Sequence, residues 1–432
     1  MNKPIAVSLA LTGARYSPWL KPNGEIHRPE PDFFAKHMPI TPEAVAEDVT
    51  NGYKAGATFF HAHARNPKTG AQYADLGWYR RTAQLVRAIN PSIMLSYPTS
   101  RKMEVGKQIE TALNILEESQ GVSPGLYDRA YNELKIRAIG VEARPDTLTT
   151  FTVPEVKMLG KPRDSRGVEE VPGWSDPDVM QLYYHGLIQR TKELGVMQEV
   201  EITTMGQFDV LKQMAKSGNY HMDAPIHFVV LLGFSNGLPI DKKTYEEALR
   251  NIEDLRRGID QPTVISIGAV IRPKEASKFP RPLLKGKHDY QEVMGWVAND
   301  PRVNIFRVGL EDTPELYGWQ LTNPELVTHA VKFFNGHGRD VITDPRILRD
   351  TFAVSKVGVI PFDEKENTNL NFPKTEENKD EVQEALKRGG VSNEQIEKVI
   401  EDAETKPPTV IPPSPGALPE GALPETSKEK AK

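Results

Sequence analysis

The side chains best suited to chemistry are two histidines one residue apart, His61 and His63, within Phe60–Arg65. On a β-strand, side chains two positions apart point to the same face, so both imidazoles would face the same way. Two imidazoles at a strand end suit Zn²⁺ or a similar divalent ion, and the loop-forming residues 66–70 predict that the strand ends here. The alternative is one core histidine and one hydrogen-bonded histidine. These residues alone leave the two interpretations about equal.

A second polar group follows a late apolar run, in Phe306–Asp312. By the two-residue period of a strand, Arg307, Gly309 and Glu311 share a face, and Asp312 follows where strand gives way to loop. A carboxylate here would complete a site of two histidines and one carboxylate, with coordination positions open for a substrate. Arg307 beside Asp312 would keep that carboxyl ionised and oriented as a base. Taken alone, the segment slightly favours a salt bridge at a strand end.

The elements that must position these residues are predicted from short apolar runs with little alternation, which are typical of strands buried on both faces of a parallel sheet. Helical segments fall between most of the runs. Helix starts are indicated by Thr41-Pro42-Glu43, by Asn323-Pro324-Glu325 and by Asp344-Pro345. The expected strands are Ile5–Thr12, Thr58–Ala64, Ile93–Tyr97, Ala138–Ala143, Glu199–Thr203, Ile226–Leu232, Val264–Val270 and Val303–Val308.

Strands that alternate with helices in this way predict an α/β fold, a (β/α)8 TIM barrel with insertions. A doubly wound sheet is the competing fold, but no Gly-x-Gly-x-x-Gly follows the first strand. In a closed barrel the second and the last strand both border the first, so the two polar segments can converge on one ion. Segments 21–39 and 101–132 are interpreted as long insertions on the strand-to-helix side, where barrels carry their sites.

Composition excludes several classes of function. The chain of 432 residues has no cysteine, which rules out disulfides, cysteine zinc sites and cysteine nucleophiles. Its net charge of −5 argues against a general nucleic-acid binder. No apolar stretch approaches the roughly 18 residues of a membrane span. A thiol-free chain fits a reducing compartment, so we expect a cytoplasmic protein.

Three regions are expected along the chain. Residues 1–355 form the catalytic barrel, 356–405 a short helical appendage rich in charge, and 406–432 a Pro-rich tail. The tail repeats the pentad Gly-Ala-Leu-Pro-Glu at Gly416–Glu420 and Gly421–Glu425. It has almost no large apolar side chains to offset its ordering entropy, so we expect it to be disordered.

A set of stretches joins the two polar segments into a recognisable pattern. They are Val7–Ala14, Pro39–Glu43, Ala55–Arg65 with Gly70, Arg307–Asp312, Leu321–Val327 and Gly338–Arg346. This pattern resembles the β-keto acid cleavage enzyme family. The match is scattered over about residues 5–355, close at the polar segments and weak in the insertions and the tail. It implies a Zn²⁺-dependent TIM barrel in which a β-keto acid and acetyl-CoA give acetoacetate and a new CoA thioester.

The resemblance also implies roles for the polar residues. His61, His63 and Glu311 match the metal ligands of the family. Arg307 and Asp312 match the pair that removes the substrate proton.

Two further positions match family site residues. Glu199, within Gln198–Glu201, takes the place of an active-site glutamate. Thr149 falls on a substrate-binding threonine. The resemblance also implies small-molecule partners, no membrane or nucleic acid, and a homo-oligomer with a tetramer as its expected form.

The chain departs from the family after its third strand. The family has Ser-Thr-Gly-Gly there to hold the substrate carboxylate, whereas this chain has Tyr97–Ser100. Thr99 is the direct match for a substrate-binding residue, and Ser96 or Ser100 is the candidate replacement for the serine.

Two other departures concern the substrates. The member that cleaves 3-keto-5-aminohexanoate has a glutamate on strand one for the substrate ammonium, where this chain has Arg15. A cation there would repel an ammonium, so we expect a different β-keto acid. The Gly-Arg-His segment of relatives is replaced by Val270–Lys274. Arg272, Lys274, Lys278 and Arg281 are therefore candidates for CoA phosphates, with a solvated basic loop as the equal alternative.

Two other functions remain open on these residues. A metal-dependent TIM-barrel hydrolase would also use His-x-His, although such sites usually draw that pair from strand one. A relative without activity that binds a small carboxylate is the second alternative, because the family segment around Pro98 is altered.

Overall fold

The computed structural model describes residues 3–12, 19–20, 26–27, 37–66, 70, 74–99, 139–151, 177–216, 220, 222, 224–233, 237–270, 289–312 and 321–352. All of them fall within one compact unit, Met1–Phe372. The predicted appendage 356–405, the tail 406–432, Arg15 and the basic residues 272–281 lie outside the described residues. Every described helix is too short or too polar to span a bilayer.

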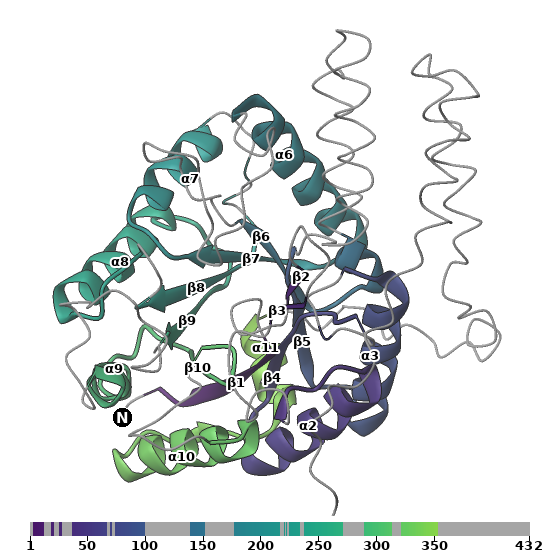
Figure 1. The fold of residues 1–432 in the computed structure, drawn as a ribbon. Coiled ribbons are helices and arrows are strands. Elements are labelled where there is room, and N and C mark those ends of the chain that lie inside the picture. Colours follow the sequence, from purple (N-terminus) through teal and green to yellow (C-terminus); the bar gives the residue numbers. More distant parts are fainter. Residues whose placement is uncertain are drawn as a thin grey trace, which may run out of the picture. The chain divides into compact units, whose positions relative to one another are not determined.

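Among the described residues, eight parallel strands close into a barrel (Figure 1). Each strand pairs with its neighbour in sequence, and the last pairs back to the first, so the predicted TIM barrel is confirmed. The barrel strands are β1 (Ile5–Thr12), β4 (Phe59–Ala62), β5 (Met94–Tyr97), β6 (Thr147–Phe151), β7 (Met197–Ile202), β8 (Ile226–Leu232), β9 (Thr263–Ala269) and β10 (Ile305–Val308). Two residues, β11 (Val341–Ile342), pair with the start of β1, and β2 (Trp19–Leu20) pairs antiparallel with β3 (Ile26–His27).

Helices surround the barrel and cover the outward faces of its strands (Figure 1). Outward strand residues such as Val7, Leu9 and Val200 are fully buried against them. This is the main core, because each helix presents one apolar stripe to the sheet. The elements are α2 (Pro42–Ala55), α3 (Leu76–Ile89), a 3₁₀ helix η1 (Ile139–Ala143), α6 (Pro177–Leu194), α7 (Gly206–Lys216), α8 (Lys242–Leu255), α9 (Asp289–Ala298), α10 (Asn323–Gly336) and α11 (Pro345–Phe352).

The prediction for the fourth strand is wrong. The apolar run Ala138–Ala143 was expected to be a strand, but Ile139–Ala143 forms η1 and the strand is β6, Thr147–Phe151. Thr147 and Thr149 of β6 donate hydrogen bonds to a carboxylate inside the barrel. Because its inward positions are hydroxyl side chains, β6 lacks the apolar run that marks a strand buried on both faces.

Helix starts follow the predicted signals with one shift. Thr41 caps α2, since its hydroxyl accepts the N–H of Ala44 at 3.2 Å. For α10 the capping residue is Thr322, one position before the predicted Asn323. The backbone N–H and the hydroxyl of Thr322 donate to Glu325 at 2.8 and 2.7 Å. The side chain of Asn323 therefore takes no part in the cap.

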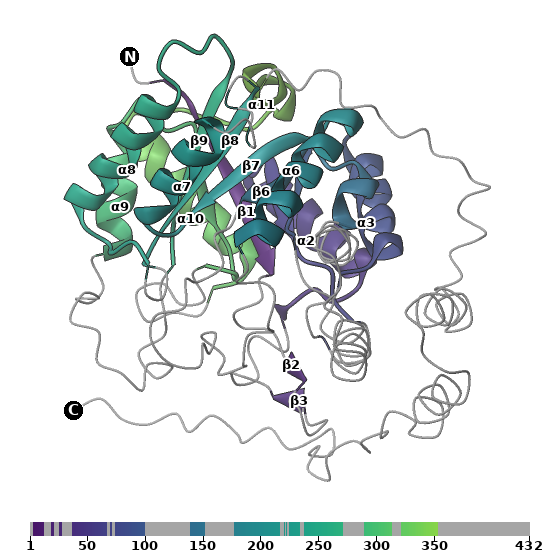
Figure 2. The same cartoon turned by 90° about the horizontal axis from the view of Figure 1, so that it is seen from above.

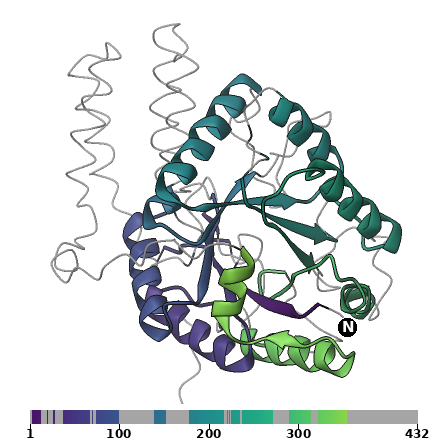
Figure 3. The same ribbon diagram turned by 180° about the vertical axis from the view of Figure 1, so that it is seen from behind.

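Helix α11 covers the end of the barrel where the strands begin (Figures 2 and 3). Its Leu348 is fully buried in an apolar layer inside this end, formed by Ala6, Phe59, Met94, Met197, Val264, Ile305, Ile342 and Leu348. Arg349 donates to the carbonyl of Ser92 at 2.7 Å and forms an ion pair with buried Asp146 at 2.7 Å.

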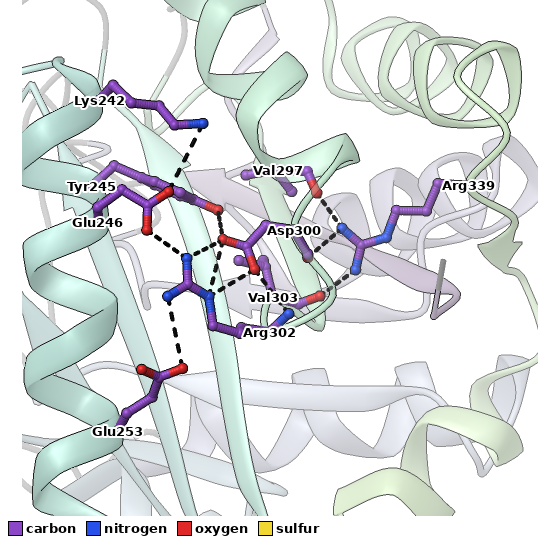
Figure 4. A network of polar contacts seen from close by, with 9 residues as sticks. All are labelled: Lys242, Tyr245, Glu246, Glu253, Val297, Asp300, Arg302, Val303 and Arg339. Carbon is purple, nitrogen blue, oxygen red and sulfur yellow. Dashed lines mark hydrogen bonds and ion pairs between the residues drawn. The ribbon is translucent and has the colours of Figure 1, made fainter. Parts of the chain in front are cut away.

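A polar network fixes the turn that precedes β10 at the same end (Figure 4). Asp300 accepts hydrogen bonds from Tyr245 at 2.9 Å and from Arg302, and Arg302 also bonds Glu246 at 2.7 Å. The fully buried Arg339 donates to three carbonyls of this region, those of Val297, Asp300 and Val303. Its buried charge is thus satisfied by backbone carbonyls, and two of them, those of Val297 and Asp300, also accept backbone N–H groups.

Candidate metal centre and active site

A belt of buried polar side chains crosses the middle of the barrel interior. Strand alternation places it above the apolar layer, one polar residue from each of six consecutive strands. Its members are His61, Ser96, Thr147, Glu199, His227 and Ser266. Strand register supports this, because His61 lies opposite Ser96, Ser96 opposite Thr147, and Glu199 opposite His227.

The three predicted metal ligands converge at one side of this belt. Nε2 of His61 lies 3.1 Å from Nε2 of His63, and Nε2 of His63 lies 3.3 Å from Oε1 of Glu311. Nε2 of His61 lies 3.8 Å from Oε2 of Glu311, and all the ligand atoms are within 4.8 Å of one another. Ligands bound about 2.0–2.1 Å from a tetrahedral zinc ion stand roughly 3.3 Å apart. The donor atoms are therefore spaced as such an ion requires.

The state of the donor atoms also fits a cation. Oε2 of Glu311 is buried and has no hydrogen-bond partner among the described residues, a costly arrangement for a carboxylate oxygen unless a cation satisfies it. Burial lowers the pKa of His61 to about 3, although the charge of Glu311 acts in the opposite direction. The imidazole is therefore neutral at neutral pH, the form that binds metals.

A chain of hydrogen bonds sets the tautomer of His61. Its Nδ1 lies 3.0 Å from Oγ of Ser96, and Ser96 donates to Oε2 of Glu199 at 2.8 Å. Burial raises the pKa of Glu199, but hydrogen bonds from His227 and Ser96 outweigh this and hold it below its ordinary value. The ionised Glu199 only accepts, so Ser96 must give it the hydroxyl proton and accept the proton on Nδ1 of His61. The lone pair of Nε2 then faces the ligand cluster.

Glu199 is enclosed by donors. Besides Ser96, its carboxylate accepts from Thr147 at 2.9 Å and from Thr149 at 3.0 Å, and it lies 3.1 Å from Nδ1 of His227. Both oxygens are engaged and the residue is 2% exposed. The predicted active-site glutamate thus lies buried in the barrel interior, where the predicted substrate-binding Thr149 donates a hydrogen bond to it.

A single guanidinium holds both carboxylates at the end of β10. Nε and Nη2 of Arg307 donate to the two oxygens of Asp312, at 2.6 and 3.2 Å. Nη2 also lies 3.0 Å from Oε1 of Glu311. Arg307 and Asp312 are 4% and 2% exposed, so this two-pronged contact is shielded from water and fixes the orientation of Asp312.

The turn after β10 requires a glycine. Gly309 has φ +138°, and a Cβ there would come within 2.0 Å of the carbonyl oxygen of Ala10 on β1. This close approach brings the chain across β1, whose Ala10 lies opposite His61. Glu311 reaches the histidines for this reason.

The remaining predicted residues have different outcomes. Thr99 follows the end of β5, is half-buried, and makes no polar contact within the described part of the chain. His227 is a hydrogen-bonded core histidine, because its Nε2 lies 2.6 Å from Oγ of Ser266 and its Nδ1 contacts Glu199. Arg15 lies outside the described residues.

Sequence reasoning missed Thr147, Ser266 and Glu201. Glu201 shares the inward face with Glu199, one step nearer the strand end, and is half-buried. Burial raises the pKa of Glu201 to about 7, while Arg307 lowers it and Glu311 raises it. The two-residue period from Glu199 is the signal that would have found it.

The sequence is similar to a known protein family and to a characterised protein. A family model described as beta-keto acid cleavage enzyme matches residues 20–274. A 3-dehydrocarnitine:acetyl-CoA trimethylamine transferase from Rhizobium meliloti (strain 1021) is 23% identical over 360 residues, which covers 81% of this chain and 96% of the relative.

Solved structures give weaker similarities. A ternary complex of ObcA with a C4-CoA adduct and oxalate has a TM-score of 0.45 and 17% identity, covering 73% of this chain and 67% of that chain. The homocysteine methyltransferase MmuM from Escherichia coli has a TM-score of 0.37 and 12% identity, covering 76% of this chain and 95% of that one.

Proposed function

Because the chain belongs to the β-keto acid cleavage enzyme family, we propose that it cleaves a β-keto acid with acetyl-CoA in a metal-dependent reaction. The products are acetoacetate and a new acyl-CoA. The observation that carries the metal dependence is the convergence of His61, His63 and Glu311. The name of the Rhizobium relative supports acetyl-CoA as the co-substrate.

The three ligands suit Zn²⁺ or another divalent ion and leave coordination positions for a substrate. When bound, the ion would polarise the substrate ketone and stabilise the negative charge that deprotonation creates. No side-chain nucleophile is needed, which agrees with a chain that has no cysteine.

Asp312 is the proposed base. It takes the proton from the carbon between the ketone and the carboxylate, while Arg307 donates to both of its oxygens and fixes their orientation. The resulting carbanion attacks the thioester carbonyl of acetyl-CoA and releases the CoA thiolate. The thiolate then adds to the original ketone, the carbon–carbon bond breaks, and Asp312 returns the proton to the acetoacetate that leaves.

We assign Glu199 as a positioning residue, because its carboxylate reaches the ligand cluster through Ser96 and His61. Thr99 and Thr149 are the proposed substrate-binding threonines. Arg15 supports a substrate without an ammonium on its side chain. A panel of β-keto acids with neutral, anionic and amino substituents tests this, and preference for the amino substrate would contradict it.

The central experiment is metal analysis of the purified protein followed by an assay of acyl-CoA formation. We expect about one zinc per chain and turnover that requires both acetyl-CoA and a β-keto acid. His61→Ala should lose both. His337→Ala is the matched control, because His337 is exposed and stacks on Phe333. A wild-type protein that takes up no metal would refute the metal centre.

The same assay distinguishes the two alternatives. Substrate hydrolysis that does not require acetyl-CoA would favour the metal-dependent hydrolase. His61 lies on the second barrel strand, β4, and His63 directly follows that strand, which argues against that class. Metal binding with no turnover of any β-keto acid would favour the inactive carboxylate-binding relative.

A further inference from the structure

Asn323 is an almost fully buried asparagine whose amide lies between three elements. It is 1% exposed, and the cap of α10 is formed by its neighbour Thr322. Its Oδ1 accepts the backbone N–H of Leu310 at 2.9 Å. Its Nδ2 donates to the carbonyl of Leu11 at 3.3 Å and to Oδ2 of Asp48 at 2.6 Å. Every hydrogen-bonding group of the amide is therefore directed at β1, α2 or the segment after β10.

These partners lie beside the metal ligands. Leu310 directly precedes Glu311 in the segment Gly309–Asp312, which we call the β10 turn. Within the turn, the N–H of Asp312 donates to the carbonyl of Gly309 at 3.1 Å, and the N–H of Glu311 points to Ala10 at 3.4 Å. The latter contact is at the long limit for a hydrogen bond. Of the two contacts that backbone N–H groups of the turn make with other elements, the bond from Leu310 to Asn323 is the shorter.

We propose that Asn323 is a positioning residue for the metal centre. Its amide holds the β10 turn so that Glu311 reaches the two histidines while Asp312 remains with Arg307. Asp48 fixes which way the amide faces, because a carboxylate accepts only from the NH₂ side. This inference rests on the proposed function, in which Glu311 is a metal ligand.

The donor pattern explains why an asparagine is needed. Aspartate has nearly the same size but offers no donor when ionised. Asn323→Asp would place a second carboxylate 2.6 Å from the oxygen of Asp48 and face the carbonyl of Leu11 with an acceptor. Two carboxylates at that distance in a buried site either repel or share a single proton. In both states the donor to the carbonyl of Leu11 is lost, so we expect the β10 turn to shift.

The chain offers a matched control in Asn304. It lies just before β10, at the opposite end of the same strand, and its Oδ1 accepts the backbone N–H of Ile265 at 2.9 Å. Asn304→Asp makes the same chemical change far from the β10 turn. Asn304→Asp keeps the acceptor for Ile265, so it tests whether an Asn-to-Asp change near β10 is enough to weaken zinc binding. A loss of global stability would speed hydrogen exchange throughout the barrel, whereas a loss of positioning would speed it in the β10 turn.

The experiment combines two measurements on the full chain. Zinc affinity is measured by competition with a chelator, and hydrogen exchange of the metal-free protein is followed by mass spectrometry in peptides that cover 305–312. We expect N323D to weaken zinc binding roughly tenfold or more and to speed exchange in the turn. N304D should leave the zinc affinity and the exchange of Leu310–Asp312 as in wild type. The double variant D48N/N323D restores a donor–acceptor contact and should recover part of the affinity.

The outcomes separate the inference from the proposed function. Unchanged exchange of the turn in N323D would overturn the inference, as would an equal loss of zinc affinity in N304D. If wild type binds no zinc, the proposed function fails. The exchange data alone then decide whether Asn323 positions the turn.

Discussion

At the scale of single residues, two adjacent carboxylates after β10 have separate tasks in the proposed mechanism. Glu311 faces the histidines, while Asp312 is held by both nitrogens of Arg307. Glu311→Gln should therefore lose most of the bound zinc. Asp312→Asn should keep the metal but lower kcat by roughly 10²–10⁴-fold, the usual contribution of a general base. Metal content and kcat measured on both variants check this. Loss of metal in D312N would contradict the division.

The hydrogen-bond chain behind His61 leads to a second prediction. Ser96→Ala removes the partner that holds the Nδ1 proton of His61, so zinc affinity should fall by roughly 10–100-fold. Ser266→Ala is the matched control, because Ser266 bonds His227 and not His61. Chelator competition measures both variants. Equal losses in the two would mean that the belt acts only through overall stability.

Glu201 gives a pH-dependent prediction for stability. Burial is the main reason that the pKa of Glu201 is about 7 in the folded chain. In the unfolded chain the pKa is near the ordinary 4.5. The folded state thus holds this proton more tightly, and stability declines as pH rises from about 4.5 to 7. Glu201→Gln removes the penalty. In EDTA it should raise the free energy of unfolding by on the order of 2 kcal/mol at pH 8, and not at pH 4.5.

The control for this comparison is Glu247, an exposed glutamate on α8. Glu247→Gln should change the free energy of unfolding little at either pH. Denaturant unfolding at the two pH values provides the measurement. If E201Q gained the same stability at both, titration of Glu201 would not be its cause.

At the scale of elements, the glycine of the β10 turn can be tested against another glycine of positive φ. Gly309→Ala would bring a Cβ into collision with the carbonyl oxygen of Ala10. We therefore expect the free energy of unfolding to fall by several kcal/mol and zinc binding to be lost. Gly338, φ +71°, has no atom within 4 Å of a built Cβ. Gly338→Ala should cost only about 1 kcal/mol and leave zinc binding intact. Thermal unfolding and metal content distinguish them.

Strands were predictable where successive side chains are all apolar because both faces of the strand are buried. Apolar runs located β1, β8 and β9 almost to the residue, because both of their faces are covered. The apolar run at η1 was wrongly predicted as a strand, because apolar residues also pack against the outer surface of a barrel. β6 was missed because its inward threonines serve Glu199.

The candidate site was predictable in part for a similar reason. The barrel topology placed His61 on one strand beside β1 and Glu311 just after the other, so their convergence followed from neighbour relations. The belt behind them did not follow, because it depends on strand register. A one-residue shift in pairing turns every side chain to the other face. Asn323 was predicted to cap α10 because it directly precedes Pro324. Its place in the sequence does not show which groups its amide hydrogen-bonds.

At the scale of the whole barrel, an apolar layer and the candidate metal ligands lie at opposite ends. Leu348 of α11 fills the apolar layer where the strands begin, far along each strand from the ligands. Leu348→Ala should cost about 2–5 kcal/mol through the cavity that it leaves, with zinc affinity and kcat of the folded protein unchanged. Calorimetry together with a kinetic assay below the unfolding transition tests this. A large drop in kcat would show that the two ends are coupled.

The position of the ligands on the barrel has one more consequence. His61 lies on β4 and Glu311 in the turn after β10, and these two strands border β1 on either side, where the last strand pairs with the first. An ion held there would link β4 to the segment after β10, across β1. It would thus join two stretches of chain that are far apart in the sequence. Binding of the ion would then stabilise the closure of the barrel as well as form the active site. Removing the ion with a chelator should loosen the pairing of β10, β1 and β4 before that of β7 and β8.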